Sequence, residues 1–171
     1  MTEKPPLQHI KAVAFDLGGT LLDIARLSVQ GAPPYTVIPG VVETLAALEG
    51  RVICCVASNS ELAGHVLARD MAAVGISGYF TQVFTSHSIG VGKPNPRFFR
   101  ALLSTLEIAP GACVMIGDSY PADIVGAKAV GMHTIWYAPR TTAAQTPDAD
   151  VVITSMGGVI PALEQIEASL A

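Results

Sequence analysis

Five short apolar runs, each continuous rather than alternating with polar residues, constrain most strongly how this chain folds. They are Ala12–Phe15, Val52–Ala57, Val114–Ile116, Ile135–Tyr137 and Val151–Ile153. Continuous apolarity predicts strands that are covered on both faces, as in a parallel sheet beneath helices. Residues 83–86, Val-Phe-Thr-Ser, indicate a further short strand.

Segments with helical spacing separate these runs. Asn95 and Pro96 predict the start of one helix, as N-cap and first helical residue, and another helix is expected to follow Pro121 and end near Gly131. The apolar positions expected to face the core are, helix by helix, Val41, Leu45 and Leu48; Leu62, Val66 and Val74, before a stop at Gly75; Phe98, Phe99, Leu102, Leu103 and Leu106; and Val159, Leu163, Ile166 and Leu170. This alternation predicts an α/β fold with a doubly wound, open parallel sheet of Rossmann-like type and helices on both faces.

The length predicts a single domain over residues 1–171, because 171 residues are enough to bury a core without disulfide or metal support. Residues 21–38 form the only sizeable insertion, which we expect to be a short flap and not a cap domain. Residues 138–149 have no apolar period and are expected to be a loop. Cys54, Cys55 and Cys113 lie in apolar runs without metal-ligand spacing and are expected to be reduced core residues.

The composition excludes several classes of function. A net charge of −4 with only 10 Lys and Arg excludes nucleic-acid binding through electrostatic contacts to phosphates. No apolar stretch is long enough to span a membrane, and the N-terminus lacks the apolar core of a signal peptide, so we expect a cytoplasmic protein. Half of the residues are hydrophobic and only 14% are charged, which suggests an exposed apolar face that pairs with a second subunit in a homo-oligomer.

Polar residues follow the predicted strands where ligands bind in open α/β sheets. Asp16 ends the first run, Ser58 ends the second, and Asp118 and Asp123 follow the run that begins at Val114, while Lys93 stands before a helix. Carboxylates, a hydroxyl, an ammonium group and nearby glycines suit a divalent cation and a phosphoryl group. The residues therefore predict phosphate chemistry.

Four ordered motifs in the same places resemble those of the haloacid dehalogenase superfamily, over residues from about 10 to 138. They are Phe15–Leu21, Val56–Asn59, Gly92–Pro96 and Gly117–Asp123. The resemblance implies a Mg²⁺-dependent phosphohydrolase that forms an aspartyl phosphate and takes a phosphorylated substrate. The short insertions imply that it is capless, with an open site.

The resemblance also implies a role for each matching residue. Asp16 would be the nucleophile, and Ser58 and nearby backbone N–H groups would hold the phosphoryl oxygens. Lys93 would neutralise charge on the nucleophile and the phosphate. Asp118 would bind Mg²⁺ with Asp16, and Asp123 would hold the water shell of the metal or orient Lys93. The expected substrate-binding set is Ser58, Asn59, Lys93, Gly18 and Gly19, and the expected metal set is Asp16, Gly18, Asp118 and Asp123.

One position departs from the phosphatase pattern. Gly18 stands where phosphatases of this superfamily carry a second aspartate, which protonates the leaving oxygen and then activates water. Because the family uses the backbone carbonyl at this position for the metal, Gly18 retains metal binding and lacks the acid–base group. Loss of such a group costs about 10²–10⁴ in rate. The alternatives are that Asp23 supplies the proton, or that the chain is a regulatory member that binds Mg²⁺ and a phosphorylated ligand without turnover.

Simpler structural roles are alternatives for single residues. Asp16 would cap nearby backbone groups, Lys93 would be a solvated loop lysine, Ser58 would cap a helix near Ser60, and Asp123 would favour a helix N-terminus. Three other motif assignments fail. The segment 87–94 lacks the first glycine and the hydroxyl of a phosphate-binding P-loop, no Asp-x-x-His supports a GDS-type esterase, and the acidic order is the reverse of a response-regulator receiver.

Overall fold

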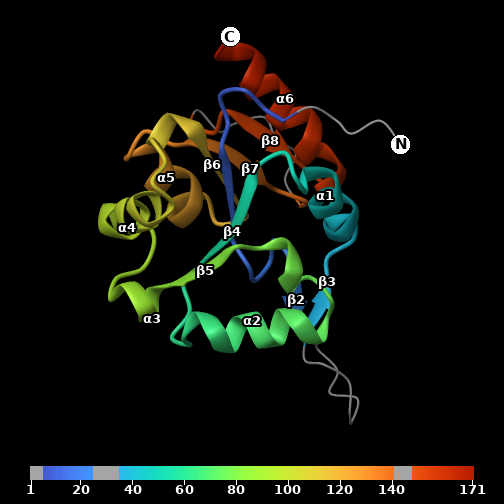
Figure 1. Cartoon of the computed structure of the whole chain (residues 1–171), viewed down its shortest axis with the longest axis vertical. Helices are drawn as coiled ribbons and strands as arrows, with labels where there is room; N and C mark the ends of the chain where they lie inside the picture. Colours follow the sequence, from blue (N-terminus) through green and yellow to red (C-terminus); the bar gives the residue numbers. More distant parts are fainter. Residues whose placement is uncertain (1–5, 25–34, 141–147) are drawn as a thin grey trace.

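The computed structural model describes residues 6–24, 35–140 and 148–171 (Figure 1). A parallel sheet of six strands forms its centre, in the order β5-β4-β1-β6-β7-β8. These strands are β1 (Ala12–Phe15), β4 (Ile53–Ser58), β5 (Gln82–Thr85), β6 (Cys113–Gly117), β7 (His133–Tyr137) and β8 (Val151–Ile153). All five predicted strands and the further short strand are present, so the predicted fold class is confirmed.

Helices cover both faces of the sheet, with α1 and α6 on one side and α4 and α5 on the other (Figure 1). The helices are α1 (Val41–Leu48), α2 (Gly64–Ala73), α3 (Ser86–Ile89), α4 (Pro96–Leu106), α5 (Gly126–Lys128) and α6 (Val159–Ser169). A π-helical turn, Tyr120–Val125, leads into α5. No helix among the described residues is long and apolar enough to cross a lipid bilayer.

Strand β1 shows how the sequence separates two hydrophobic cores. Val13 and Phe15 pack with residues of α1, α2 and α6, whereas Ala12 and Ala14 pack with residues of α4 and α5. Alternate side chains of a strand point to opposite faces, so the large residues fill one side and the small ones admit the aromatic side chains of α4 on the other. All four side chains are fully buried.

Helix α4 matches the sequence prediction most closely. Asn95 is its N-cap, accepting a hydrogen bond from the backbone N–H of Arg97 at 3.0 Å, and Pro96 is its first residue. Its buried face consists of Phe98, Phe99, Leu102 and Leu103, with Leu106 partly buried against the same core.

The prediction for α2 was right about its end before Gly75 and about Val74, which packs against the core, and wrong about Leu62. Leu62 lies before the helix and is 45% exposed, and the buried residues of α2 are Leu67 and Met71. The helix begins at Gly64, where a side-chain carbon would collide with the backbone carbonyl oxygen of Val83. This close approach to β5 sets which face of α2 meets the sheet.

The insertion at residues 21–38 contains two strands that the sequence analysis missed. Strands β2 (Leu22–Ile24) and β3 (Tyr35–Val37) pair antiparallel, and this hairpin lies beside α2 (Figure 1). Strands of three residues are too short to show a period in the sequence. Residues 25–34 of the predicted flap and residues 141–147 of the predicted loop lie outside the described residues.

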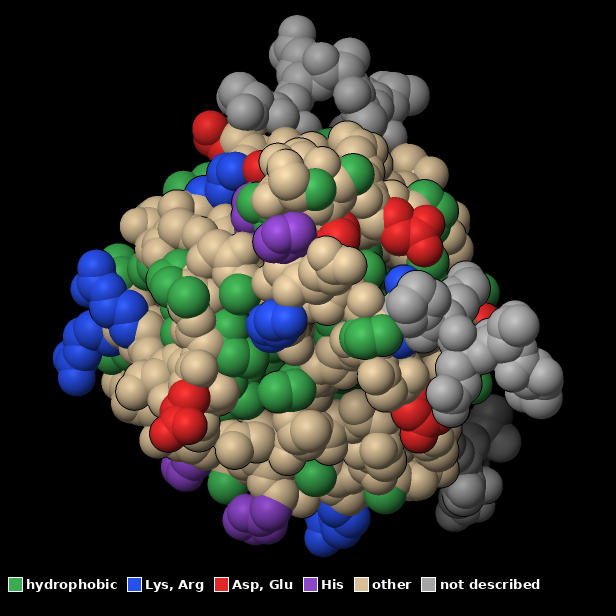
Figure 2. Space-filling model, turned by 45° about the horizontal axis from the view of Figure 1, so that its top comes forward, with side chains coloured by type: hydrophobic (Ala, Val, Ile, Leu, Met, Phe, Trp, Pro, Cys, Tyr) green, Lys and Arg blue, Asp and Glu red, His purple; other side chains and the backbone are tan. Residues whose placement is uncertain are grey.

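Hydrophobic side chains on the face drawn in Figure 2 gather near its centre around a cationic side chain, and the acidic residues stand nearer the rim. The large hydrophobic residues that are most exposed are Val42, Ile53, Leu62 and Val125. Three of them come from different elements, and Leu62 lies in the loop before α2. The homo-oligomer suggested by the composition stays a prediction.

Candidate active site

The site lies at the carboxyl ends of three adjacent strands. Asp16 follows β1, Ser58 ends β4 and Asp118 follows β6, and β1 lies between the other two in the sheet. The backbone N–H of Asp16 donates to the carbonyl of Ile116 at 2.8 Å, which extends the pairing of β1 and β6 to the site. Parallel strand ends of this kind bring residues far apart in the chain together.

Lys93 connects the parts of the site. Its Nζ lies 2.9 Å from Asp16 Oδ1, 2.6 Å from Asp123 Oδ1 and 2.6 Å from the carbonyl oxygen of Ala57. The side chain is only 2% exposed. Burial acts to lower its pKa, but the charges of Asp16 and Asp123 outweigh burial and raise it above the usual value. The ammonium therefore stays charged, and its burial excludes the solvated loop lysine considered as an alternative.

Asp123 is fully buried in the π-helical turn. One carboxylate oxygen receives the Lys93 ammonium, and the other accepts the backbone N–H of Ser119 at 3.0 Å. Burial raises the pKa of Asp123 to about 6, although Lys93 acts to lower it. Of the two roles expected from the resemblance, these contacts favour orientation of Lys93, and the role stays a prediction.

Asp16, Asp118 and Asp123 form a cluster whose carboxylate oxygens lie within 4.8 Å of one another. Asp118 is exposed and accepts a hydrogen bond from Thr20 Oγ1 at 3.1 Å. Burial of part of its surface and the negative charge of Asp16 raise the pKa of Asp118. Crowded carboxylates of this kind are stabilised by a cation, and hard oxygen ligands suit Mg²⁺.

Asn59 lines the cavity around Asp16, but its side-chain amide is hydrogen-bonded to the backbone of Lys93. Its Oδ1 accepts from the Lys93 N–H and its Nδ2 donates to the Lys93 carbonyl, both at 2.7 Å. This pair of bonds holds the segment before α4 against the end of β4. Asn59 therefore fixes the position of the lysine, a function that the sequence motif did not reveal.

The two glycines after Asp16 differ in what they allow. Gly19 has φ +81°, and a side-chain carbon there would stand 2.6 Å from Asp118 Oδ2. At Gly18, a side-chain carbon would meet no atom within 4 Å. Only Gly18 has room for a side chain, so the absence of an acid–base residue at this position is not forced by packing.

A cavity of about 360 Å³ joins these groups. Its lining consists of Asp16, Gly18, Ser58, Asn59, Lys93, Asp118, Ser119, Ala122 and Asp123. Thr20 and Trp136 support it from outside the predicted set, since Trp136 Nε1 donates to the carbonyl of Asp118 at 3.0 Å. Thr20 belongs to the first motif and was open to prediction, whereas Trp136 carried no motif signal.

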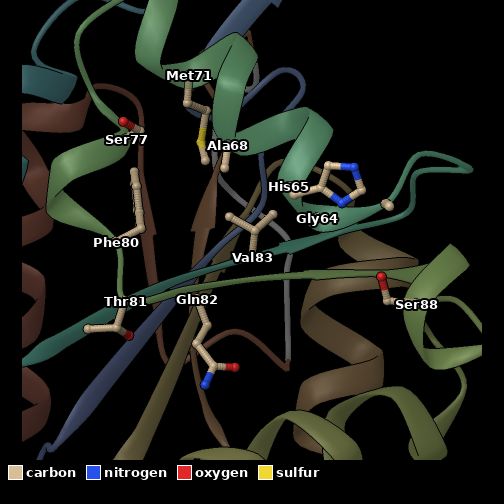
Figure 3. A pocket seen from close by; sticks show the side chains of 11 residues that line it. Gly64, His65, Ala68, Met71, Ser77, Phe80, Thr81, Gln82, Val83 and Ser88 are labelled. Carbon is tan, nitrogen blue, oxygen red and sulfur yellow. The ribbon is translucent and has the colours of Figure 1, made fainter.

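A separate cavity of about 460 Å³ lies between α2 and the edge strand β5 (Figure 3). In the close view, His65 of α2 stands near Val83 of β5, with Phe80 and Met71 on the other side. None of its lining residues lines the cavity around Asp16. Among the described residues, its lining contains no carboxylate or lysine.

A family model described as haloacid dehalogenase-like hydrolase matches residues 28–131, which is more than half of the chain. The match includes Ser58, Lys93, Asp118 and Asp123, and it begins after Asp16. The chain therefore belongs to the haloacid dehalogenase-like hydrolases.

Curated relatives include phosphatases. The chain is 34% identical over 103 residues to haloacid dehalogenase-like hydrolase domain-containing protein 3 of Mus musculus, covering 58% of this chain and 41% of that protein. It is 34% identical over 94 residues to glyceraldehyde 3-phosphate phosphatase of Pyrococcus furiosus, covering 53% of this chain and 39% of that protein. Phosphoserine phosphatase of Thermus thermophilus is 35% identical over 66 residues, covering 39% of this chain and 26% of that protein. The matched region spans less than half of each relative.

Solved structures share the fold. A phosphatase of this superfamily from Thermococcus onnurineus superposes with a TM-score of 0.77 at 21% identity, covering 90% of this chain and 98% of that one. The hydrolase YfnB of Bacillus subtilis, whose structure contains magnesium, superposes with a TM-score of 0.78 at 15% identity, covering 91% and 99%. At these identities, the likeness establishes the architecture alone.

Proposed function

We propose that this chain is a capless, Mg²⁺-dependent phosphohydrolase that works through an aspartyl phosphate on Asp16 and has weakened acid–base catalysis. The observation that carries the proposal is the buried Lys93 ammonium, which contacts both Asp16 and Asp123 at hydrogen-bond distance. A lysine held in this way lies next to the nucleophile and can neutralise a phosphoryl group on it. Phosphatases among the relatives support the same reaction class.

The residues present fit a magnesium ion. Asp16 and Asp118 offer carboxylate oxygens, the backbone carbonyl of Gly18 offers a third ligand, and one ammonium does not balance the three clustered carboxylates. Asp123 gives both oxygens to Lys93 and Ser119, so we assign it to positioning the lysine and the water shell of the ion. When bound, Mg²⁺ supplies positive charge that polarises the phosphoryl oxygens and offsets repulsion from Asp16.

In the first step, a carboxylate oxygen of Asp16 bonds to phosphorus while the bond from phosphorus to the leaving oxygen breaks. The Ser58 hydroxyl and nearby backbone N–H groups hold the phosphoryl oxygens, and Lys93 neutralises their charge. The leaving oxygen keeps the electron pair and takes its proton from solvent, because Gly18 has none to donate. Water then attacks the phosphorus and loses a proton to solvent while the bond from phosphorus to the Asp16 oxygen breaks, which releases inorganic phosphate and restores the Asp16 carboxylate.

The architecture we propose is one domain over residues 1–171 with residues 21–38 as a flap and no cap. The composition also favours a homo-oligomer in which a second copy shields the open site. A sedimentation experiment tests this directly: an assembled species at micromolar concentration supports it, and a single 17.7 kDa species contradicts it.

A second candidate is a regulatory member that binds Mg²⁺ and a phosphorylated ligand without turnover, and Gly18 is the residue that favours it. Activity with acetyl phosphate, whose leaving group needs no proton, distinguishes the two. We expect Mg²⁺-dependent hydrolysis by the wild type, loss with a chelator, and a loss of at least about 10³-fold in Asp16→Asn. Turnover at the wild-type rate by a folded Asp16→Asn protein would contradict the proposal.

A further inference from the structure

We propose that the leaving group of the substrate binds in a cavity between the β2–β3 hairpin and α2, and that it is compact, apolar or aromatic, and free of negative charge. This inference rests on the proposed phosphohydrolase function and adds a substrate class to it. The cavity has a volume of about 180 Å³. Its lining consists of Leu17, Gly18, Leu22, Tyr35, Ser58, Asn59, Ser60, Leu67 and Asp70.

The position of this cavity connects it to the reaction. It shares Gly18, Ser58 and Asn59 with the cavity around Asp16. The two cavities therefore adjoin, and a group that leaves a phosphorus atom held near Ser58 lies next to this one. A side-chain carbon at Gly18 would meet no atom within 4 Å apart from its chain neighbours, so no packing around Gly18 fills the space beside the shared wall.

The walls of the cavity define what fits there. Leu17, Leu22 and Leu67 provide apolar surface, and Tyr35 adds a half-buried aromatic ring. A protein cavity of about 150 Å³ lined by apolar side chains holds one benzene molecule, so this volume suits a single ring or a short branched chain. The half-buried Asp70 adds negative charge to the lining, which disfavours a leaving group that carries a carboxylate or a second phosphate.

The chemistry of the site leads to the same class of substrate by an independent route. Without an acid at Gly18, an alkoxide leaves poorly, whereas an aryloxide is a stable anion that leaves without a proton. The shape of the cavity and the missing proton donor therefore both favour aryl phosphates.

A second neighbouring cavity is the competing location. It has a volume of about 530 Å³ and is lined in part by Asp23, Asp118, Trp136 and Arg140. It shares only Asp118 with the cavity around Asp16, and the exposed Arg140 would suit an anionic leaving group. The two locations thus predict opposite preferences for charge.

The test compares kcat/KM for phenyl phosphate, 4-carboxyphenyl phosphate and acetyl phosphate in the full chain with Mg²⁺. We expect the wild type to prefer phenyl over 4-carboxyphenyl phosphate, although the carboxylated phenol is no worse as a leaving group. Asp70→Lys should raise the ratio of 4-carboxyphenyl to phenyl phosphate activity by about three- to tenfold. Glu43→Lys makes the same charge change on an exposed residue outside both cavities and should leave that ratio unchanged.

Tyr35→Ala removes the aromatic wall and should lower the ratio of phenyl to acetyl phosphate activity by about three- to tenfold. Asp70→Lys keeps the proposal testable if this variant fails to fold. Equal ratios in wild type, Tyr35→Ala and Asp70→Lys would overturn the assignment of the cavity. A preference for 4-carboxyphenyl phosphate that is lost in Arg140→Ala would place the leaving group in the competing cavity.

The failure of the proposed function has a different signature. If acetyl phosphate is hydrolysed by the wild type and not by Asp16→Asn, the phosphohydrolase proposal holds whatever the ratios show. If none of the three substrates depends on Asp16, the underlying function fails, and the leaving-group assignment fails with it.

Discussion

The two sides of the Asp16 carboxylate differ sharply. On the Lys93 side, the polar atoms of Lys93 and Asp123 have short hydrogen bonds, and both side chains are almost completely buried. On the other side, Gly18 has no side chain, and the space that a side chain would fill is open. Burying two charges costs free energy unless both are paired and hydrogen-bonded. The hydrogen bonds on the Lys93 side therefore hold a positive charge at a fixed position beside Asp16. Under the proposed mechanism, the first side therefore provides the nucleophile and the charge that neutralises the phosphoryl group, and proton transfer is left to solvent or substrate.

Gly18→Asp would remove the difference between the two sides and has the largest expected effect. Space for the side chain exists, so the variant should fold normally. We expect turnover of alkyl phosphates to rise by up to about 10²–10⁴, with a much smaller rise for aryl phosphates. Steady-state kinetics with glycerol phosphate and phenyl phosphate measures this.

Two results would contradict the account of Gly18. One is equal hydrolysis of alkyl and aryl phosphates by the wild type, and the other is a Gly18→Asp protein that gains nothing with either. Asp23 is then the first residue to test as proton donor, because it is exposed on β2 and lines the cavity beyond Asp118. Loss of alkyl phosphate turnover in Asp23→Asn would identify it.

Lys93→Met tests the other side of the comparison. Removing the ammonium leaves Asp16 and Asp123 without a counter-charge, and we expect kcat with acetyl phosphate to fall by about 10²–10³. Lys128→Met is the matched control, because Lys128 pairs with Asp150 at 2.6 Å on the surface, away from the site. Comparable losses in both variants would show that the effect is general and not specific to Lys93.

Glu167→Gln should lower the stability of the fold without changing the active site. Glu167 accepts backbone N–H groups from Gln8, His9 and Ile10 at 2.6–2.9 Å, which fixes the chain before β1. Hydrogen bonds to charged groups contribute about 1.5–3 kcal/mol, so we expect a loss of this order in the free energy of unfolding. Relative activity at 25 °C should not change, because the contact lies at the opposite end of β1 from Asp16.

The same variant has a defined pH dependence. Burial acts to raise the pKa of Glu167, but the three N–H donors prevail and lower it. A lowered pKa contributes stability that is present above the unfolded value of about 4.3 and is lost as pH falls through the folded value. The difference in melting temperature between wild type and Glu167→Gln should therefore be full at pH 7 and shrink below about pH 4. A difference that grows on acidification would contradict this sign.

The sequence predicted the sheet and α4 because their signals are local. A continuous apolar run marks a covered strand, and Asn95 with Pro96 marks a helix start without reference to the rest of the fold. The face of α2 could not be predicted because the packing of Gly64 against Val83 sets it. The hairpin was missed because each of its strands has three residues and depends on its partner.

Much of the site could also be anticipated, since Asp16, Ser58 and Asp118 follow strands that a doubly wound sheet places side by side. The contacts that each of these residues makes could be known only from the three-dimensional structure. Only the distances show that Asn59 binds the Lys93 backbone and that both oxygens of Asp123 are engaged. The open space at Gly18 and the cavity next to it depend on packing from four elements, β2, β3, β4 and α2, and leave no signature in the sequence.

The most direct test of the contrast between the two sides is a rapid-mixing experiment with wild-type protein, Mg²⁺ and phenyl phosphate. Phosphorylation of Asp16 needs no acid when the leaving group is phenoxide, whereas hydrolysis of the aspartyl phosphate does need a base that Gly18 cannot provide. We predict a burst of phenol close to one equivalent per protein, followed by slower turnover, and a much smaller burst in Gly18→Asp. Linear phenol release without a burst in the wild type, at the same rate in Gly18→Asp, would contradict it.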